Sequence, residues 1–569
     1  MDTRLPLSAD PVPDRVRTLL FATPPIDYVA ETAQYWSELG FGGFLRPDII
    51  PGWQCDAWSL DPKDPHSQHV VGEENPRFRS IRDMVYRLND VGVRDNFIVV
   101  PFTKELPDWF DDAEWSRIAR NFEHAALFAR EAGFAGLALD DEYIEDQLGL
   151  NWPGYRASGI SLDAIRGKAR QRGREIQHAM LSTFPTMTTL HLPETFSIEG
   201  DLAKELFYGY LDVLVEEEAP GGMHVLPEST YFMQQAEWVA RYGYGLDRIL
   251  IDTLPSKAKA YWSRCCGIGL GLSPLGYLRF IRDENGRRLG YGGRPEVFGD
   301  RILEAGEDKS GNYSAEVFAE THAAARTASR RYVWVFSGGP VWWRMSSEQH
   351  ARYGGSSIAT LPLTDDFADY VETVRVPKII DTPFYQSIDT AVRNSSTFDT
   401  LEGLGMPRKW LVTGPFTNEN GVGYERVFGP EADPNPTAEY DGLFSSVRWN
   451  AVDTPLSGYV DLSRLIAGGT DICGYALIWI ECTEPVDAVL RFGSDDSGRI
   501  RLNGKWIHGV DTERIGFPDE DTVPVRFEVG RNEVLLKVCN YRGGWGFYFR
   551  VTDTEGNEIP RVHFTTEWK

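Results

Sequence analysis

The feature that most constrains the fold is a repeated alternation of short apolar runs with amphipathic segments between residues 15 and 345. Parallel strands need a crossover connection, usually a helix, so this alternation is typical of α/β folds. Residues 202–214 carry apolar side chains at helical spacing and are expected to form a helix. We expect strands at 17–23, 43–45, 96–102, 136–140, 187–191, 223–227, 248–252 and 331–336. Eight such strands predict a (β/α)8 barrel.

An open, doubly wound sheet is the alternative fold, but no glycine-rich phosphate-binding sequence follows the first predicted strand. Two glycine-containing segments after the seventh predicted strand, 267–272 and 283–295, do not fit the alternation. We expect them to form a long loop at the mouth of the barrel, because loops of this length are usually functional or disordered. Such a loop could close one end of a cleft in its own chain or in a neighbouring subunit. A homo-oligomer is therefore one of the alternatives.

The character of the sequence changes after a polar, irregular stretch at 375–405. Short alternating strands follow, separated by turns such as Asn503-Gly504, and they predict an all-β sandwich of the jelly-roll type. The expected domains are a barrel at 1–374, a linker at 375–405 and a sandwich at 406–569. Asp495 and Asp496 in the sandwich could bind calcium or form a plain turn.

Composition narrows the range of ligands. The net charge of −26 disfavours nucleic acid and anionic membranes as partners, and it suits a neutral sugar. The 17 Trp residues fit the same ligand, because indole faces stack on sugar rings. The six Cys residues show no metal-binding spacing, so we expect reduced thiols, no metal and no cofactor. The chain begins without an apolar signal core, which predicts a cytoplasmic protein as written, or a secreted or periplasmic one if a signal was removed.

The clearest functional motif is the run 136–143, in which an apolar strand ends in Asp140, Asp141 and Glu142. Charged groups at the end of a buried strand cost desolvation free energy, and catalytic residues collect at the C-terminal ends of barrel strands. Because side chains alternate along a strand, Asp140 and Glu142 are expected on one side. The alternatives are a salt bridge for Glu142 and a capping contact for Asp140.

Glycosidic bond cleavage usually needs two carboxyl groups, one to protonate the leaving oxygen and one to attack or to activate water. We expect Glu142 to be the general acid or acid/base, with Asp140 orienting it, raising its pKa or binding a hydroxyl group. Glu228, after the sixth strand, is the expected second carboxylate, unless it caps the following helix. Asp252 and Glu194 also lie at predicted strand ends and remain alternatives.

Further residues at predicted strand ends are candidates for binding substrate. His191 ends the fifth strand and could contact a hydroxyl group, although a satisfied core histidine explains it equally well. Trp334 is expected to be a core residue. The remaining candidate binding residues are Trp53, Tyr143, Tyr231, Asp252, Trp342 and Trp343.

The last third of the chain resembles the galactose-binding-like sandwiches that often accompany sugar-active enzymes. The motifs that carry this resemblance are 410–416, 492–498, 502–505 and 543–550. The first two thirds resemble bacterial (β/α)8-barrel glycoside hydrolases. That resemblance rests on Asp140-Asp141-Glu142, on Glu228 with Tyr231, and on 332–337 followed by Trp342-Trp343.

The resemblance implies a glycosidase with catalytic carboxyl groups at the strand ends. One departure is Gly338-Gly339, which stands where such proteins tend to have a Glu after strand eight. This departure keeps a second interpretation open, namely a non-catalytic carbohydrate-binding protein on a barrel scaffold. A metal-dependent aldolase or isomerase is a third, but it needs a ligand set of which only His191 is well placed.

Overall fold

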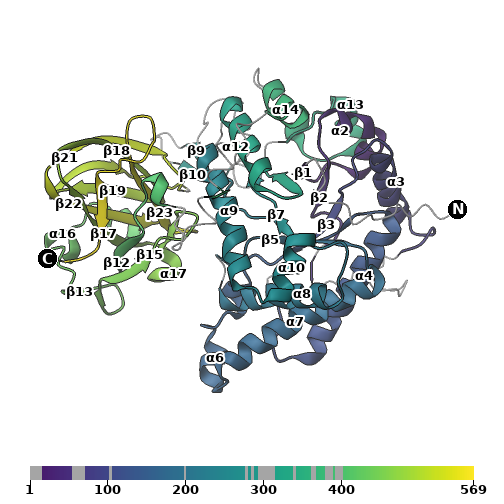
Figure 1. Ribbon diagram of the computed structural model, residues 1–569, viewed down its shortest axis with the longest axis horizontal. Coiled ribbons are helices and arrows are strands. Elements are labelled where there is room, and N and C mark those ends of the chain that lie inside the picture. The colour runs from purple at the N-terminus through teal and green to yellow at the C-terminus, as the bar shows by residue number, and fades with distance from the viewer. Residues whose placement is uncertain are drawn as a thin grey trace. The chain divides into compact units, whose positions relative to one another are not determined.

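The computed structural model describes residues 16–50, 52–53, 71–101, 106–197, 200–275, 280–282, 288–291, 314–337, 341–360, 367–378, 389–390, 401–514 and 516–568. Two compact units make up the chain (Figure 1). The first comprises Met1–Tyr231, Gln235–Gly276 and Asn312–Arg393, and the second comprises Phe232–Gln234, Tyr277–Gly311 and Asn394–Lys569. Two features of the sequence lie outside the described residues. One is Gly338-Gly339, which stands where similar proteins tend to have a Glu, and the other is the part of the expected loop at 283–287 and 292–295.

The first unit is built on a curled parallel sheet of nine described strands in the order β7-β6-β5-β4-β3-β2-β1-β11-β8. Most of the predicted strands are confirmed in position. They are buried along almost their whole length, because a parallel sheet with covered faces buries both sides of each strand. The strands are β1 (Arg17–Phe21), β2 (Gly43–Arg46), β3 (Phe97–Pro101), β4 (Gly136–Asp140), β5 (Thr188–Leu192), β6 (Met223–Val225), β7 (Gly267–Ile268), β8 (Gly271–Leu272) and β11 (Tyr332–Val335).

The segment that contains β7 and β8 supplies the strands at both ends of this order. β7 pairs with β6, β8 pairs with β11, and only Gly269 and Leu270 separate the two strands. Hydrogen bonds continue through the gap, from Gly269 N to Val225 O and from Trp334 N to Leu270 O. The expectation of a loop at 267–272 was therefore wrong. This glycine-rich segment is the strand that follows β6.

Helices pack against the sheet, and α4, α7 and α8 lie side by side (Figure 1). The predicted helix at 202–214 is confirmed as α8, whereas the predicted strand at 248–252 is wrong because these residues end helix α9. The helices of this unit are α1 (Ile26–Glu31), α2 (Ala33–Glu38), α3 (Pro76–Asp90), α4 (Asp112–Ala132), α5 (Ile144–Leu148), α6 (Pro153–Ser158), α7 (Leu162–Thr183), α8 (Asp201–Glu216), α9 (Ala236–Thr253), α10 (Ser256–Cys265), α12 (Ala315–Ala328), α13 (Ser347–Tyr353), η3 (Ser357–Thr360) and α14 (Phe367–Arg375).

The inner face of the curled sheet can be identified from contacts between strands that are not neighbours. The ring of Tyr332 on β11 lies 5.7 Å from that of Phe97 on β3 and 5.2 Å from that of His224 on β6. Trp334 is two residues beyond Tyr332 and therefore shares this inner face. It is in register with Gly271, and a Cβ atom at Gly271 would lie 2.8 Å from the indole nitrogen. The glycine gives the indole its space.

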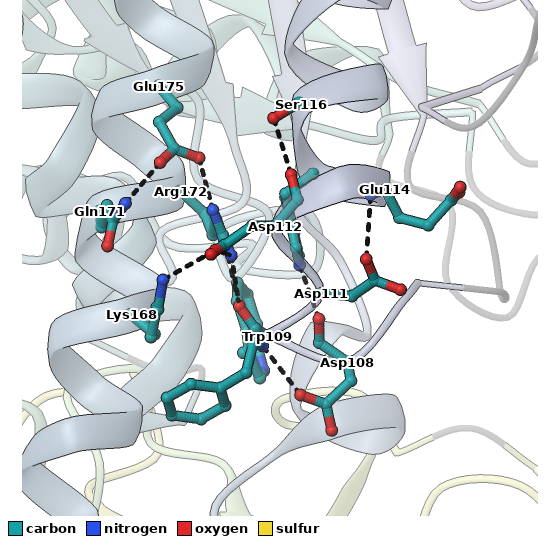
Figure 2. A network of polar contacts seen from close by, with 12 residues as sticks. Asp108, Trp109, Asp111, Asp112, Glu114, Ser116, Lys168, Gln171, Arg172 and Glu175 are labelled. Carbon is teal, nitrogen blue, oxygen red and sulfur yellow. Dashed lines mark hydrogen bonds and ion pairs between the residues drawn. The ribbon is translucent and has the colours of Figure 1, made fainter.

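A polar network joins the start of α4 to α7 (Figure 2). Arg172 is 1% exposed and donates to the Trp109 carbonyl at 2.9 Å and to Asp112 at 2.5 Å. Lys168 donates to the same carboxylate at 2.8 Å. Lys168 and Arg172 together lower the pKa of Asp112 to about 2. The network fixes the chain between β3 and α4 against α7.

The second unit contains antiparallel sheets. Its two larger sheets have the described orders β15-β12-β17-β22-β19-β20, with β24 beside β17, and β16-β23-β18-β21. One hydrophobic cluster takes side chains from both, including Trp410, Ile478, Leu490 and Phe547. The elements are β9 (Phe280–Arg282), β10 (Arg288–Tyr291), η4 (Glu402–Leu404), β12 (Lys409–Thr417), η5 (Glu419–Gly421), α16 (Gly429–Ala432), β13 (Glu439–Asp441), β14 (Ser446–Arg448), β15 (Asn450–Asp453), β16 (Val460–Asp461), α17 (Leu462–Leu465), β17 (Ile472–Cys482), β18 (Val486–Asp495), β19 (Ser497–Leu502), β20 (Lys505–Val510), β21 (Asp521–Phe527), β22 (Gly530–Asn540), β23 (Gly546–Thr552) and β24 (Val562–Thr565).

Among the helices that the structure describes, none combines the length and the apolar character needed to cross a membrane.

Candidate functional site

Asp140 lies at the C-terminal end of β4 on the inner face of the sheet. Gly136 of β4 is in register with Phe97, whose ring faces inward, and Asp140 follows Gly136 by four residues. Residues an even number apart on a strand point to the same side, so the Asp140 carboxyl group also points inward. Its Oδ1 accepts a hydrogen bond from the backbone N–H of Glu142 at 3.3 Å.

The environment of Asp140 favours its protonated form. Burial and the negative charge of Glu142 raise the pKa of Asp140 to about 7. The Asp140 carboxyl group is therefore protonated more readily than an exposed aspartate, because neighbouring carboxylates resist being ionised together. A proton on a half-buried acid at a strand end is what a general acid needs.

Asp140→Asn is expected to make the protein less sensitive to rising pH. The aspartate has a pKa near 3.8 when exposed and about 7 in the fold, so its contribution is complete below pH 3.8 and is lost as pH rises through 7. The wild type should lose about 2 kcal/mol of unfolding free energy through this group between pH 5 and pH 7. Urea unfolding at both pH values measures the difference from the variant. Equal pH dependence in the two proteins would contradict the raised pKa.

Asp141, the next residue, points away from the inner face. Its carboxylate is fully buried and bonds to His191 Nε2 at 2.9 Å and to the Tyr210 hydroxyl at 3.4 Å. The His191 ring packs on Phe207 and Tyr210 of α8. His191 is thus a buried partner of Asp141 between sheet and helix, which corresponds to the core interpretation of this histidine. This pair ties the end of β4 to β5 and α8.

Glu228 follows β6 in a tight turn, with the N–H of Tyr231 donating to its carbonyl at 2.9 Å. Its side chain is half-buried. Only β5 separates β6 from β4 in the sheet, so the ends of the two strands lie roughly 10 Å apart. Glutamate side chains from these two ends can bring their carboxyl groups within the range of separations that glycosidases use, about 5–9.5 Å.

Aromatic rings gather around Trp334 on the inner face of the sheet. Tyr231 stacks on Phe336 with centroids 5.3 Å apart, and both Tyr231 and Phe21 contact Trp334. The Trp334 Nε1 and Ser273 Oγ atoms are buried and have no hydrogen-bond partner among the described residues. The sequence assigned Trp334 to the core. Its inward direction could have been derived from the strand alternation only once the inner face was known.

The predicted tryptophan platforms are packed inside the protein. Trp53 is fully buried and donates to the Val100 carbonyl at 3.2 Å. Trp342 contacts Phe318 and Phe41, and Trp343 contacts Trp36, with exposures of 1% and 3%. These three residues therefore offer no open ring face.

Two further candidates lie on the surface. Tyr143 is 52% exposed, immediately after Glu142, with a left-handed φ of 68° that is uncommon for a residue other than glycine. An exposed aromatic side chain next to the acids remains a candidate for stacking. Asp252 lies in the last turn of α9, with its side chain 63% exposed and 3.4 Å from Arg248. It is not at a strand end because the predicted seventh strand is helical.

Asp496 in the second unit binds backbone N–H groups of two other segments of that unit. Its carboxylate accepts hydrogen bonds from the backbone N–H groups of Tyr541 at 2.7 Å and Arg514 at 2.9 Å. Burial raises its pKa to about 7. In the part of the chain that the structure describes, no group of three or more His, Cys, Asp or Glu side chains is placed to hold a metal ion.

Comparisons with known proteins show limited similarity. No protein family and no curated protein matches the chain. Similar solved structures include a glucosidase from Croceicoccus marinus, at 10% identity and a TM-score of 0.30, covering 92% of this chain and 95% of that one. A glycoside hydrolase family 5 protein from Bacteroides vulgatus has 9% identity and a TM-score of 0.32, covering 92% and 89%. An exo-beta-1,4-mannosidase from Opitutaceae bacterium strain TAV5 has 11% identity and a TM-score of 0.31, covering 64% and 60%. Scores of this size carry no argument about activity.

Proposed function

We propose that this chain is a glycoside hydrolase that cleaves an oligo- or polysaccharide with carboxyl groups at the ends of parallel strands. In this proposal β1–β6, the segment 267–272 and β11 form a closed (β/α)8 barrel, and the second unit is a jelly-roll sandwich that supports the barrel or binds sugar. The observation that carries the proposal is the pair Asp140 and Glu142, in which a half-buried, inward-facing acid with a raised pKa lies beside a second carboxyl group.

The pair supplies the proton in the proposed reaction. Glu142 donates it to the glycosidic oxygen while the bond to the anomeric carbon breaks, and Asp140 holds and returns the proton. Glu228 either attacks the anomeric carbon, which gives retention, or removes a proton from the attacking water, which gives inversion. Tyr143 and the aromatic residues beside Trp334 contact the sugar, and buried donors such as Ser273 Oγ bind its hydroxyl groups.

The proposal is tested with a panel of aryl glycosides and polysaccharides, assayed for both hydrolysis and binding. We expect hydrolysis of at least one glycoside, with a rate that falls as pH rises above 7 because the acid pair loses its proton. Binding of a polysaccharide without hydrolysis of any member would instead support the non-catalytic carbohydrate-binding protein. The absence of both binding and hydrolysis would overturn the proposal for the sugars tested. The anomeric configuration of the first product, observed by NMR, distinguishes retention from inversion.

A further inference from the structure

Glu194 is a buried acid that the proposed reaction does not use. It lies two residues after β5 and is fully buried. Its Oε2 accepts a hydrogen bond from the backbone N–H of Glu228 at 2.9 Å, and its Oε1 accepts one from the N–H of Ser229 at 3.3 Å. The hydroxyl group of Tyr242 on α9 also donates to Oε1. Glu194 forms no salt bridge among the described residues. The three hydrogen-bond donors must therefore offset the free-energy cost of burying its carboxylate.

The turn that Glu194 holds is fixed on its other sides as well. The Thr230 hydroxyl donates to the carbonyl of Gly271 on β8 at 2.6 Å. The Tyr231 ring stacks on Phe336, with an angle of 17° between the ring planes. The turn therefore has polar or aromatic contacts with the chain after β5, with β8 and with the residue after β11. A backbone held in this way fixes the direction in which the Cα–Cβ bond of Glu228 leaves the chain.

We infer that Glu194 is a positioning residue, which fixes the backbone of Glu228 and Ser229 and so holds the Glu228 carboxylate where the reaction needs it. Tyr242 in turn holds the Glu194 carboxylate. This inference rests on the proposed function, in which Glu228 is the second carboxylate. Hydrogen bonds from N–H groups to a carboxylate are stronger than neutral ones. A misplacement of about 1 Å at a reacting group can cost about 100-fold in rate.

The matched variants are Glu194→Gln, Tyr242→Phe and, as a control, Tyr210→Phe. Glutamine keeps the shape of the side chain but replaces one accepting oxygen with an NH2 group, which cannot accept from a backbone N–H. Tyr210→Phe removes another bond between a buried tyrosine and a carboxylate, that of Asp141, which does not contact the turn. Hydrogen–deuterium exchange of peptides covering residues 226–233 measures the anchoring directly, with no substrate. Steady-state kinetics on the glycoside found by the panel measures its consequence.

We expect Glu194→Gln to accelerate amide exchange at Glu228 and Ser229 by at least about 10-fold, Tyr242→Phe by less, and Tyr210→Phe not at all. The value of kcat should fall about 10- to 100-fold in Glu194→Gln, with KM changed only a few-fold. Unchanged exchange in Glu194→Gln overturns the inference. Faster exchange with unchanged kcat overturns the link to catalysis. If the wild type hydrolyses no glycoside, the proposed function fails, and the exchange measurement alone then decides whether Glu194 anchors the turn.

Discussion

Replacement of Glu142 by Gln is expected to lower kcat on the hydrolysed glycoside by about 10²- to 10⁴-fold, with little change in KM. The amide keeps the size of the side chain but cannot donate an acidic proton to the leaving oxygen. The loss should be smaller for aryl glycosides with good leaving groups, because these need less protonation. Kinetics with two aryl groups of different acidity would measure the difference.

Glu114→Gln is the matched control for this experiment. Glu114 lies in the exposed first turn of α4 and pairs with Arg117 at 2.8 Å, so the same isosteric change should leave kcat within about two-fold. A Glu142→Gln variant that turns over like the control would remove Glu142 from the proposed mechanism. The double variant Glu142→Gln with Glu228→Gln should lose little more than either single variant, because residues that act as a unit are not additive.

Lys537→Met is expected to lower the unfolding free energy of the second unit by about 3–5 kcal/mol. The Lys537 ammonium is fully buried and lies 2.6 Å from Glu431 Oε1, and Glu431 is itself only 4% exposed. Tyr475 donates to the same oxygen at 2.5 Å. Removing the lysine would leave a buried carboxylate without its cation, which costs more than the lost pair itself. Differential scanning calorimetry of the full chain measures the loss.

The exposed pair of Arg526 and Asp487 on neighbouring strands provides the comparison. Its atoms are 2.7 Å apart, but the side chains are 57% and 80% exposed, so Arg526→Met should cost at most about 1 kcal/mol. Adding Glu431→Gln to Lys537→Met should recover most of the stability, since no unpaired buried charge then remains. A loss of similar size in the Lys537 and Arg526 variants would contradict the importance of burial.

The sequence predicted the strands that obey a simple pattern. The run 136–140 is apolar and ends in acid, and β4 occupies it as expected. The run 248–252 has the same local character, yet it continues a helix whose buried residues Trp238, Tyr242, Leu246 and Leu250 recur every four positions. The four-residue period over the longer window decided the structure, because it buries one helical face along the whole of α9.

The candidate site was only partly predictable. The position of the acids at the end of β4 follows from the sequence, but the side of the sheet that each faces depends on register. Asp140 and Asp141 are neighbours of one residue type, and the structure gives them opposite environments: one beside Glu142 and one beside His191. The role inferred for Glu194 depends on contacts with the turn after β6, more than 30 residues away in the chain, and no local pattern contains them.

The glycines of β7 and β8 show how interior volume is shared between strands. Gly267, Gly269 and Gly271 alternate along one segment, so it contributes no side chain to the inner face, and the indole of Trp334 occupies part of that space. A Cβ atom at position 271 would lie 2.8 Å from this indole and 2.6 Å from the Pro227 carbonyl oxygen, so both the side chain of β11 and the backbone after β6 require glycine there. Glycine at every second position, with apolar residues between, can thus mark a strand that lies next to a large side chain, where composition alone suggests a loop.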